Sequence, residues 1–202
     1  MSDFYWNKQF KERQQPHSEQ NEIISEDFLK SDFFNEKIIN LLKDSKNFLE
    51  LGCGTGEFSK KIYDICQISI LATDISKEAI NFANKNFAND HLKYECKGFE
   101  DINDKFDFCL CSNVLEHFKN PFIWIDKIIN LSKYFLILVP YNQPVTDGYD
   151  NEGGPGHVFQ FNEESFNQYN VLDFFKFKTN GWQHSSCGEE PTQLAILLKG
   201  KL

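Results

Sequence analysis

The sequence predicts an α/β protein built on a doubly wound, mostly parallel β-sheet. Short apolar runs alternate with segments of helical spacing through the central part of the chain, and a glycine-rich stretch follows the first run. Strands separated by helices form βαβ units, in which the strands lie parallel. With 202 residues, 41% of them apolar, the chain can bury one substantial core.

Seven strands are expected. Five of them cover 47–51, 68–73, 92–97, 106–111 and 134–139, and the last two have the sequences VLDFFKFK and TQLAILLKG. The helices expected between them cover 56–66, 76–88 and 120–131. Apolar residues at helical spacing over 18–43 predict two further helices, which divide near Ser31 and precede the sheet.

Local sequence signals set several boundaries. Ser76 is an expected N-cap, and Asn120 is another, with Pro121 at the first helical position. Asn162 can cap a short helix that runs to Tyr169. Glycines and prolines after residue 140 predict a long irregular loop, and the Asn-Gly pair at 180–181 predicts a turn between the last two strands.

Charge and composition exclude some classes of function. The net charge is −9, with 21 basic residues scattered among 30 acidic ones, so long nucleic acid is a poor partner. No apolar run approaches the roughly 20 residues of a membrane helix, and no membrane span is expected. The N-terminus lacks a secretory signal pattern, which favours a cytoplasmic protein. The six cysteines show no paired spacing and are expected to be reduced thiols.

The stretch LELGCGTGEF joins the first strand to the first helix of the sheet. Gly52, Gly54 and Gly56 allow a tight turn and let a ligand approach main-chain N–H groups. The spacing is G-x-G-x-G rather than the G-x-G-x-x-G of dinucleotide-binding proteins, and no Gly-Lys-Ser/Thr follows. The loop therefore predicts a ligand other than a dinucleotide or a nucleoside triphosphate.

Two acidic residues narrow the choice of ligand. Glu50 at the end of the first strand would repel a pyrophosphate, but it can accept hydrogen bonds from an ammonium group, directly or through water. Asp74 ends the second strand, where a carboxylate can accept both hydroxyls of a ribose. Together they predict an adenosyl ligand with a zwitterionic tail.

Residues 48–139 resemble the class I S-adenosylmethionine-dependent methyltransferases, with LELGCGTG as the first motif and ATDIS as the second. The resemblance implies a Rossmann-like, doubly wound, mostly parallel seven-stranded sheet with an antiparallel last strand, preceded by N-terminal helices. It also implies S-adenosyl-L-methionine as cofactor. We expect an N-terminal helical arm or cap over 1–45 and a methyltransferase domain over 46–202.

The resemblance implies contacts for each part of the cofactor. The glycine loop would contact the methionine moiety, Asp74 the ribose, and Ser112 and Asn113 would lie beside the methyl group. Relatives often carry an Asp for the adenine where this chain has Gly98. Phe99 could flank the adenine and Glu100 or Asp101 could replace the missing carboxylate, although a core Phe and solvated acids are equally good interpretations. The full expected set is Glu50, Gly52, Cys53, Gly54, Gly56, Asp74, Ile75, Phe99, Glu100, Ser112 and Asn113.

The segment VLEH, at 114–117, resembles the ubiquinone-biosynthesis O-methyltransferase branch and the small-RNA end methyltransferases. His117 and His157 are the candidate catalytic bases, because a neutral imidazole can take the proton of a hydroxyl acceptor. Members of those groups can carry a Glu in place of Asn113 that, with the Glu-His pair and another His, can hold a divalent metal. Asn113 removes one anionic donor, so no metal ligand is assigned here and a metal near Glu116, His117 and His157 stays an open question. The alternative is a helix-capping Glu116 and a hydrogen-bonded His117.

Aromatic residues in two segments could enclose the acceptor. Those in or after the long loop, Tyr141, Tyr149, Phe159 and Phe161, could close over it together with His157, and the N-terminal FYWNKQF could form the opposite wall. Tyr5 and Trp6 could instead only pack the N-terminal arm against the core.

The functional prediction is O-methylation of a small-molecule or sugar or glycan-precursor acceptor, and a homodimer is the assembly considered. The alternatives are an RNA-end or protein methyltransferase, and a non-catalytic module that only binds the cofactor.

Overall fold

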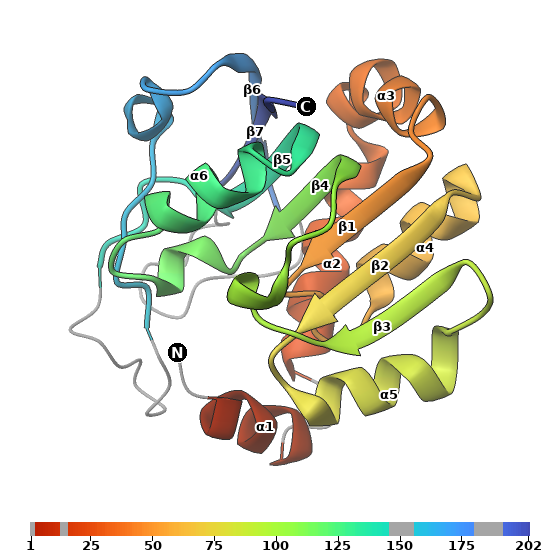
Figure 1. Cartoon of the computed structure of the whole chain (residues 1–202). Coiled ribbons are helices and arrows are strands. Elements are labelled where there is room, and N and C mark those ends of the chain that lie inside the picture. The colour runs from red at the N-terminus through yellow and green to blue at the C-terminus, as the bar shows by residue number, and fades with distance from the viewer. Residues whose placement is uncertain (1–2, 13–15, 146–155, 180–191) are drawn as a thin grey trace.

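The structure is a computed structural model that describes residues 3–12, 16–145, 156–179 and 192–202. It contains one seven-stranded sheet with helices on both faces (Figure 1). The strand order is β3-β2-β1-β4-β5-β7-β6. The strands are β1 (Asn47–Leu51), β2 (Ser69–Asp74), β3 (Leu92–Cys96), β4 (Phe106–Ser112), β5 (Ser132–Pro140), β6 (Val171–Lys178) and β7 (Thr192–Lys199).

The sheet confirms the predicted fold class. β1 pairs in parallel with β2 on one side and with β4 on the other, and the parallel pairing continues to β3 and β5. β7 is antiparallel to both of its neighbours, β5 and β6. Seven strands with the last one reversed form the Rossmann-like sheet expected from the sequence.

The strands are apolar on both faces because each face is covered. In β4, Phe108 and Leu110 belong to the core on one face, whereas Cys109 and Cys111 belong to the core on the other. This is the two-residue period of a strand that is buried on both sides. The first core is completed by helices that precede or follow β1 and β2, and the second by α6 and the 3-10 turns.

The helices begin close to the expected residues. Ser76 caps α5, since its hydroxyl oxygen accepts a hydrogen bond from the N–H of Ala79 at 3.3 Å. The prediction for Asn120 was wrong: α6 begins at Phe122, and Pro121 occupies the N-cap position without a side-chain cap. The α-helices are α1 (Asp3–Glu12), α2 (Pro16–Lys30), α3 (Ile39–Lys43), α4 (Glu57–Cys66), α5 (Lys77–Phe87) and α6 (Phe122–Ile129).

Four short helical turns complete the described secondary structure. Asn162 caps η4 as predicted, but the turn ends well before Tyr169. The turns are the π-helical η1 (Phe34–Ile38) and the 3-10 turns η2 (Phe99–Asp101), η3 (Leu115–His117) and η4 (Glu163–Phe166).

The N-terminal region contains one more helix than predicted. α2 ends at Lys30 and the chain divides at Ser31, whose hydroxyl oxygen accepts the N–H of Phe34 at 3.2 Å. This confirms the expected break. The additional helix is α1, where mixed charged and aromatic residues gave no clear helical period.

Some predictions fall on residues that the structure does not describe. Tyr149, Cys187 and the expected turn at 180–181 lie outside the described residues. The five cysteines of the described part are free thiols. The boundary at residue 45 between an N-terminal arm and a methyltransferase domain stays a prediction. Among the described helices, none is both long enough and apolar enough to cross a bilayer.

Candidate functional site

The glycine loop lies at the carboxyl end of β1 and is held by the neighbouring strand. The N–H groups of Gly52 and Cys53 both donate to the carbonyl oxygen of Thr73 in β2, at 2.7 and 2.9 Å. Gly52, Gly54 and Gly56 all have positive φ, at 73°, 53° and 90°. This left-handed backbone is strained for residues with a side chain, so the loop shape depends on glycine.

Two of the glycines are also required by close packing. A Cβ atom on Gly52 would lie 2.2 Å from Cγ2 of Val114, and one on Gly56 would lie 2.5 Å from the ring of Tyr94. Val114 directly precedes the turn η3, so Gly52 brings the loop against the segment that carries His117. Sequence analysis missed both contacts, because Val114 and Tyr94 lie far from the glycine loop in the sequence.

Asp74 lies where β2 ends and binds the glycine loop directly. Its Oδ2 accepts the N–H of Gly54 at 2.9 Å, and its Oδ1 accepts the N–H of Ser76 at 2.8 Å. Burial raises the pKa of Asp74, and the backbone N–H groups act in the opposite direction. The two motifs found in the sequence are thus joined by a hydrogen bond, and Asp74 stabilises the loop. Its contact with a ribose stays a prediction.

Glu50 is buried beneath the loop. Its side chain is 2% exposed and accepts a hydrogen bond from the hydroxyl of Ser59 in α4. Burial raises the pKa of Glu50 to about 8, so the carboxyl holds its proton at neutral pH. Contact with an ammonium group would favour loss of that proton. Sequence reasoning did not identify Ser59.

The residues expected near the adenine are divided between core and surface. Phe99 is 6% exposed and packs against Phe118 and Trp124, each with its ring centroid 5.5 Å away. Glu100 is exposed, and Ile75 is half-buried just after β2. These positions favour the interpretation of Phe99 as a core residue, and its contact with adenine stays a prediction.

Ser112 and Asn113 end β4 beside the glycine loop. Asn113 has a φ of 53°, and its Nδ2 donates to Oγ of Ser112 at 3.1 Å. Its backbone N–H donates to the carbonyl of Leu138 at 2.9 Å, which fixes the turn against β5. Both side chains are half-buried and lie next to the turn η3.

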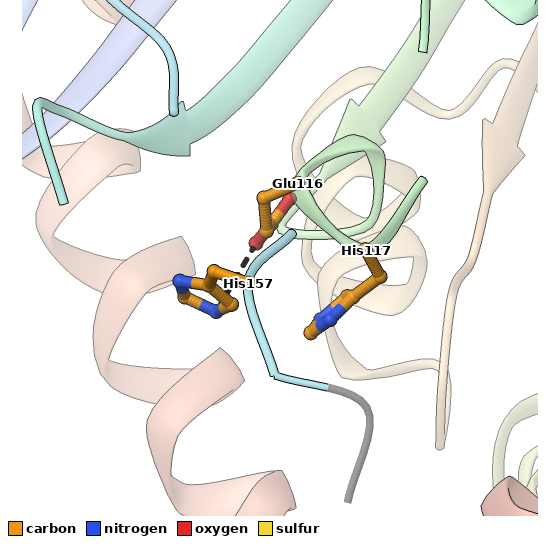
Figure 2. A group of neighbouring side chains, drawn as sticks. All are labelled: Glu116, His117 and His157. Atoms are coloured by element: carbon orange, nitrogen blue, oxygen red, sulfur yellow. Dashed lines mark ion pairs between the residues drawn. The ribbon is translucent and has the colours of Figure 1, made fainter. Parts of the chain in front are cut away.

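Glu116, His117 and His157 come together beyond the end of β4 (Figure 2). One possible ligand atom from each lies within 4.8 Å of those of the other two. His157 reaches this place because the N–H groups of Val158 and Phe159 donate to the carbonyl of Glu116, at 2.9 and 3.1 Å. The structure therefore brings together the two histidines that the sequence proposed as bases.

The electrostatics of this group are dominated by the burial of Glu116. The residue is 1% exposed, and neither carboxyl oxygen has a hydrogen-bond partner among the described residues. Burial raises its pKa to about 8. Its Oε1 lies 3.9 Å from Nε2 of His157. No metal ligand was assigned from the sequence, and a helix-capping Glu116 was the alternative, but Glu116 makes no capping bond within the part of the chain that the structure describes.

The donor set of these three residues fits a divalent metal. One carboxyl oxygen and two imidazole nitrogens are ordinary ligands for ions such as Zn²⁺ or Mn²⁺, and a buried carboxyl without partners gains most from an ion. Glu116, His117 and His157 would hold such an ion, which would supply Lewis acidity. Asn113 contributes no anionic donor, because its side-chain amide is neutral, and its Nδ2 donates to Ser112.

Aromatic residues of the N-terminal segment and of the segment after the long loop were expected to enclose the acceptor, and only some of them lie near the histidines. Trp6 of α1 packs against His117, with ring centroids 5.5 Å apart at 72°, so the N-terminal segment does reach the site. Phe161 is fully buried and packs against Phe159 and Phe166. Phe161 is therefore a core residue in this structure rather than an exposed side chain at the site.

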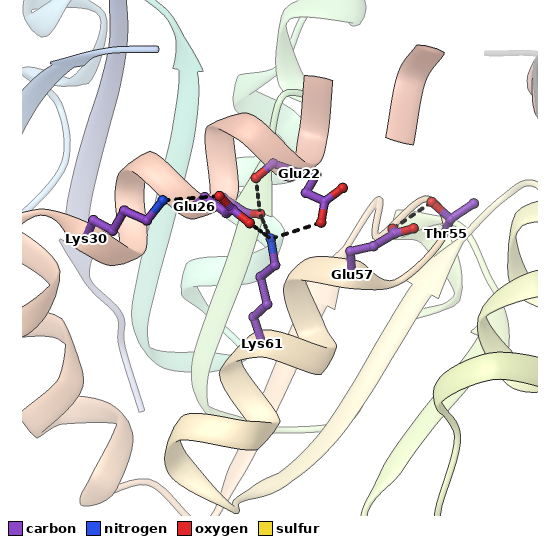
Figure 3. A network of polar contacts seen from close by, with 7 residues as sticks. Glu22, Glu26, Lys30, Thr55, Glu57 and Lys61 are labelled. Carbon is purple, nitrogen blue, oxygen red and sulfur yellow. Dashed lines mark hydrogen bonds and ion pairs between the residues drawn. The ribbon is translucent and has the colours of Figure 1, made fainter. Parts of the chain in front are cut away.

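The helix that follows the glycine loop is tied to α2 by ion pairs (Figure 3). Nζ of Lys61 in α4 lies 3.2 Å from Glu26 and 3.7 Å from Glu22, both in α2. At the start of α4, the hydroxyl of Thr55 donates to Glu57 at 2.6 Å. These contacts join the N-terminal helices to the loop that is expected to bind the cofactor.

A surface hollow of about 620 Å³ lies at the opposite edge of the sheet. It is lined by exposed lysines, among them Lys46 and Lys105, near the amino ends of β1 and β4, and contains none of the predicted site residues. Ligands of open parallel sheets bind at the carboxyl ends of the strands, so we assign no function to this hollow.

Comparison with known proteins agrees with this geometry. Residues 27–180 match the sequence profile of a family described as "Methyltransferase domain". A ubiquinone biosynthesis O-methyltransferase of Glaesserella parasuis serovar 5 (strain SH0165) is 30% identical over 111 residues. That match covers 50% of this chain and 46% of the relative, so the chain spans about half the length of the curated relative it matches.

Solved structures share the fold at low identity. A putative S-adenosylmethionine-dependent methyltransferase from Listeria monocytogenes has a TM-score of 0.61 at 17% identity, over 84% of this chain and 98% of the other. The N-terminal domain of EvdMO1, crystallised in the presence of SAH and D-fucose, has a TM-score of 0.59 at 15% identity, over 82% and 81%. S-Adenosylmethionine is the cofactor of this group of proteins.

Gly52→Ala should abolish tight binding of S-adenosylhomocysteine. The new Cβ would meet Val114 and would also demand a left-handed backbone, and both effects displace the loop. Isothermal titration calorimetry would measure the loss. The double variant Gly52→Ala, Val114→Ala removes the collision alone, so it should recover only part of the affinity. Full recovery would show that the backbone conformation does not matter.

Glu116→Gln should reduce the dependence of stability on pH. The unfolded chain loses the Glu116 proton near pH 4.3, whereas the folded protein keeps it to about 8, so the free energy of unfolding falls as pH rises between these values. At about 1.4 kcal/mol per pKa unit, the variant should gain a few kcal/mol over wild type from pH 5 to pH 8. Urea unfolding with a chelator present would measure this. Glu100→Gln, at an exposed carboxylate, should follow wild type at each pH.

Lys61→Met should lower the free energy of unfolding by about 0.5 to 1 kcal/mol, because its ion pairs with α2 are partly exposed. The matched control is Lys60→Met, since Lys60 pairs only with Asp64 within α4. Denaturant unfolding at low and high salt would compare them. An equal loss in both variants would contradict a special role for the contact between helices.

Proposed function

The chain belongs to the methyltransferase-domain family, and from this membership we propose that it transfers the methyl group of S-adenosylmethionine to a hydroxyl of a small molecule. The observation that carries the proposal is the contact between the glycine loop, bound to Asp74, and the turn that bears His117. The glycine loop and Asp74 suit cofactor binding, and His117 suits removal of a proton from the acceptor. The proposed acceptors include the hydroxyl of a sugar or of a glycan precursor.

The residues present fit the cofactor. The loop has no side chains at three positions with left-handed backbone, and Asp74 offers carboxylate lone pairs beside it. When bound, S-adenosylmethionine supplies an electrophilic methyl group on a sulfonium sulfur. In the proposed arrangement Asp74 binds the ribose hydroxyls and Glu50 lies beneath the methionine part. Ser112 and Asn113 border the methyl group.

His117 is the preferred base. Its Nδ1 lies 3.3 Å from the carbonyl oxygen of Gly156, and a carbonyl can only accept, so the ring hydrogen belongs on Nδ1. The lone pair is then on Nε2, which, when it binds no metal ion, can take the hydroxyl proton of the acceptor as the methyl group passes from sulfur to oxygen. His157 is the second candidate, with its Nε2 toward Glu116.

The name of the curated relative supports oxygen as the methyl acceptor, and the acidic net charge argues against the RNA alternative. An RNA-end or protein substrate and a non-catalytic cofactor module remain the competing proposals. RNA binding that falls steeply with salt would favour the first. Tight cofactor binding without transfer to any acceptor would favour the second.

Binding of S-adenosylhomocysteine tests the cofactor half of the proposal. Asp74→Asn should raise the Kd about tenfold or more, because a charged acceptor of ribose hydrogen bonds is lost. Asp104→Asn, at an exposed acid outside the loop, should leave the Kd unchanged. Calorimetry that detects no binding to folded wild-type protein would remove the proposal.

Transfer of a labelled methyl group to a panel of alcohols, phenols and sugars tests the other half. His117→Asn should lower kcat about a hundredfold at saturating acceptor while binding of S-adenosylhomocysteine is retained. The loss should vary with pH, because a general base acts only in its deprotonated form. Equal pH profiles for wild type and variant would assign the base to another residue.

A further inference from the structure

Helix α1 reaches across the candidate site from the N-terminal end of the chain. Figure 1 shows α1 against the start of α5, near the carboxyl ends of the central strands. Oδ1 of Asn7 accepts the hydroxyl of Ser76 at 3.0 Å and the N–H of Glu78 at 3.2 Å. Ser76 follows Asp74 by two residues, so one anchor of α1 is the turn expected to bind the ribose.

The second anchor is the indole of Trp6 on His117. Their ring centroids are 5.5 Å apart at 72°, and the His117 and His157 centroids are 5.1 Å apart at 71°. The rings of Trp6, His117 and His157 therefore pack edge to face in that order. Such contacts restrict the orientation of an imidazole more than water does. Trp6 thus holds the ring that is proposed to accept the proton.

The same face of α1 carries a buried amide without a complete set of partners. Gln9 is 7% exposed and lies one helical turn after Trp6. Its Oε1 has no hydrogen-bond partner among the described residues. A buried carbonyl oxygen without a donor costs free energy, so a ligand that brings a donor to it is favoured.

We propose that α1 forms a wall of the acceptor pocket, where Trp6 positions His117 and Gln9 accepts a hydrogen bond from a second hydroxyl of the acceptor. The proposal rests on the proposed function. It assigns Trp6 a positioning role and Gln9 a role in specificity.

These contacts define the chemistry of the acceptor. A ring with an apolar face suits the indole, and at least two hydroxyls are needed, one for methylation and one for Gln9. A neutral sugar and a polyhydroxylated aromatic ring share this chemistry, and the probes below distinguish them.

The first test uses NMR on the full-length protein saturated with S-adenosylhomocysteine. A methyl glycoside and a dihydroxybenzene are titrated separately, and the Trp6 indole and Gln9 amide signals are assigned with Trp6→Phe and Gln9→Leu. One probe should shift both signals, while the indole of Trp124, which packs against Phe99, stays in place. If neither probe moves the α1 signals of cofactor-loaded protein, the inference is wrong although the proposed function stands.

The second test is kinetic and uses whichever probe class binds. Trp6→Leu should lower kcat at least tenfold, and Trp6→Phe should restore most of it because a ring is kept against His117. Gln9→Leu should raise KM for the acceptor about tenfold with little change in kcat. Kd for S-adenosylhomocysteine should stay within threefold of wild type in all three variants.

The matched control is Phe82→Leu, which removes a ring that is 47% exposed on α5 and should leave all constants unchanged. Wild-type kcat and KM in Trp6→Leu and Gln9→Leu would overturn the inference. If wild-type protein binds no S-adenosylhomocysteine, the proposed function fails first. Should Trp6→Leu not fold, Trp6→Phe and Gln9→Leu still decide between these outcomes.

Discussion

The two hydrogen bonds from Gly52 and Cys53 to the carbonyl of Thr73 are the constraint on which the candidate site depends. They hold the loop after β1 against the end of β2, so that Gly54 meets Asp74. The same loop presses on Val114 and thereby aligns the turn after β4. Three neighbouring parallel strands thus end in segments that contact one another. Gly52 and Gly54, at these contacts, have the left-handed backbone that glycine adopts without strain.

Two buried carboxyl groups, those of Glu50 and Glu116, dominate the electrostatics of the site. Glu50 and Glu116 are both almost fully buried, and burial raises the pKa of each to about 8. Glu50 has the hydroxyl of Ser59 as a partner, whereas Glu116 has only the distant imidazole of His157. A bound cation, whether an ammonium, a sulfonium or a metal ion, would stabilise their ionised forms. The site is therefore suited to positively charged ligands in two separate places.

The sequence predicted the features that depend on local patterns. The strand β1 has the expected bounds, and Ser76 caps α5 because a cap needs only the residues next to it. Helix α1 was not predicted, since its stability in this fold comes from Trp6 and Asn7, which contact residues far along the chain. Phe99 shows the same limit, because its identity fits an adenine contact and a core position equally well. Long-range packing decides such cases, and a single sequence does not contain it.

The double hydrogen bond to the carbonyl of Glu116 has a consequence for how this protein can diverge. The N–H groups of Val158 and Phe159 bind the carbonyl oxygen of Glu116 directly after His157. The position of His157 therefore depends on these two hydrogen bonds rather than on the length of the connection from β5. Lengthening a loop adds little entropic cost. The connection can therefore change in length while His117 and His157 keep their contact.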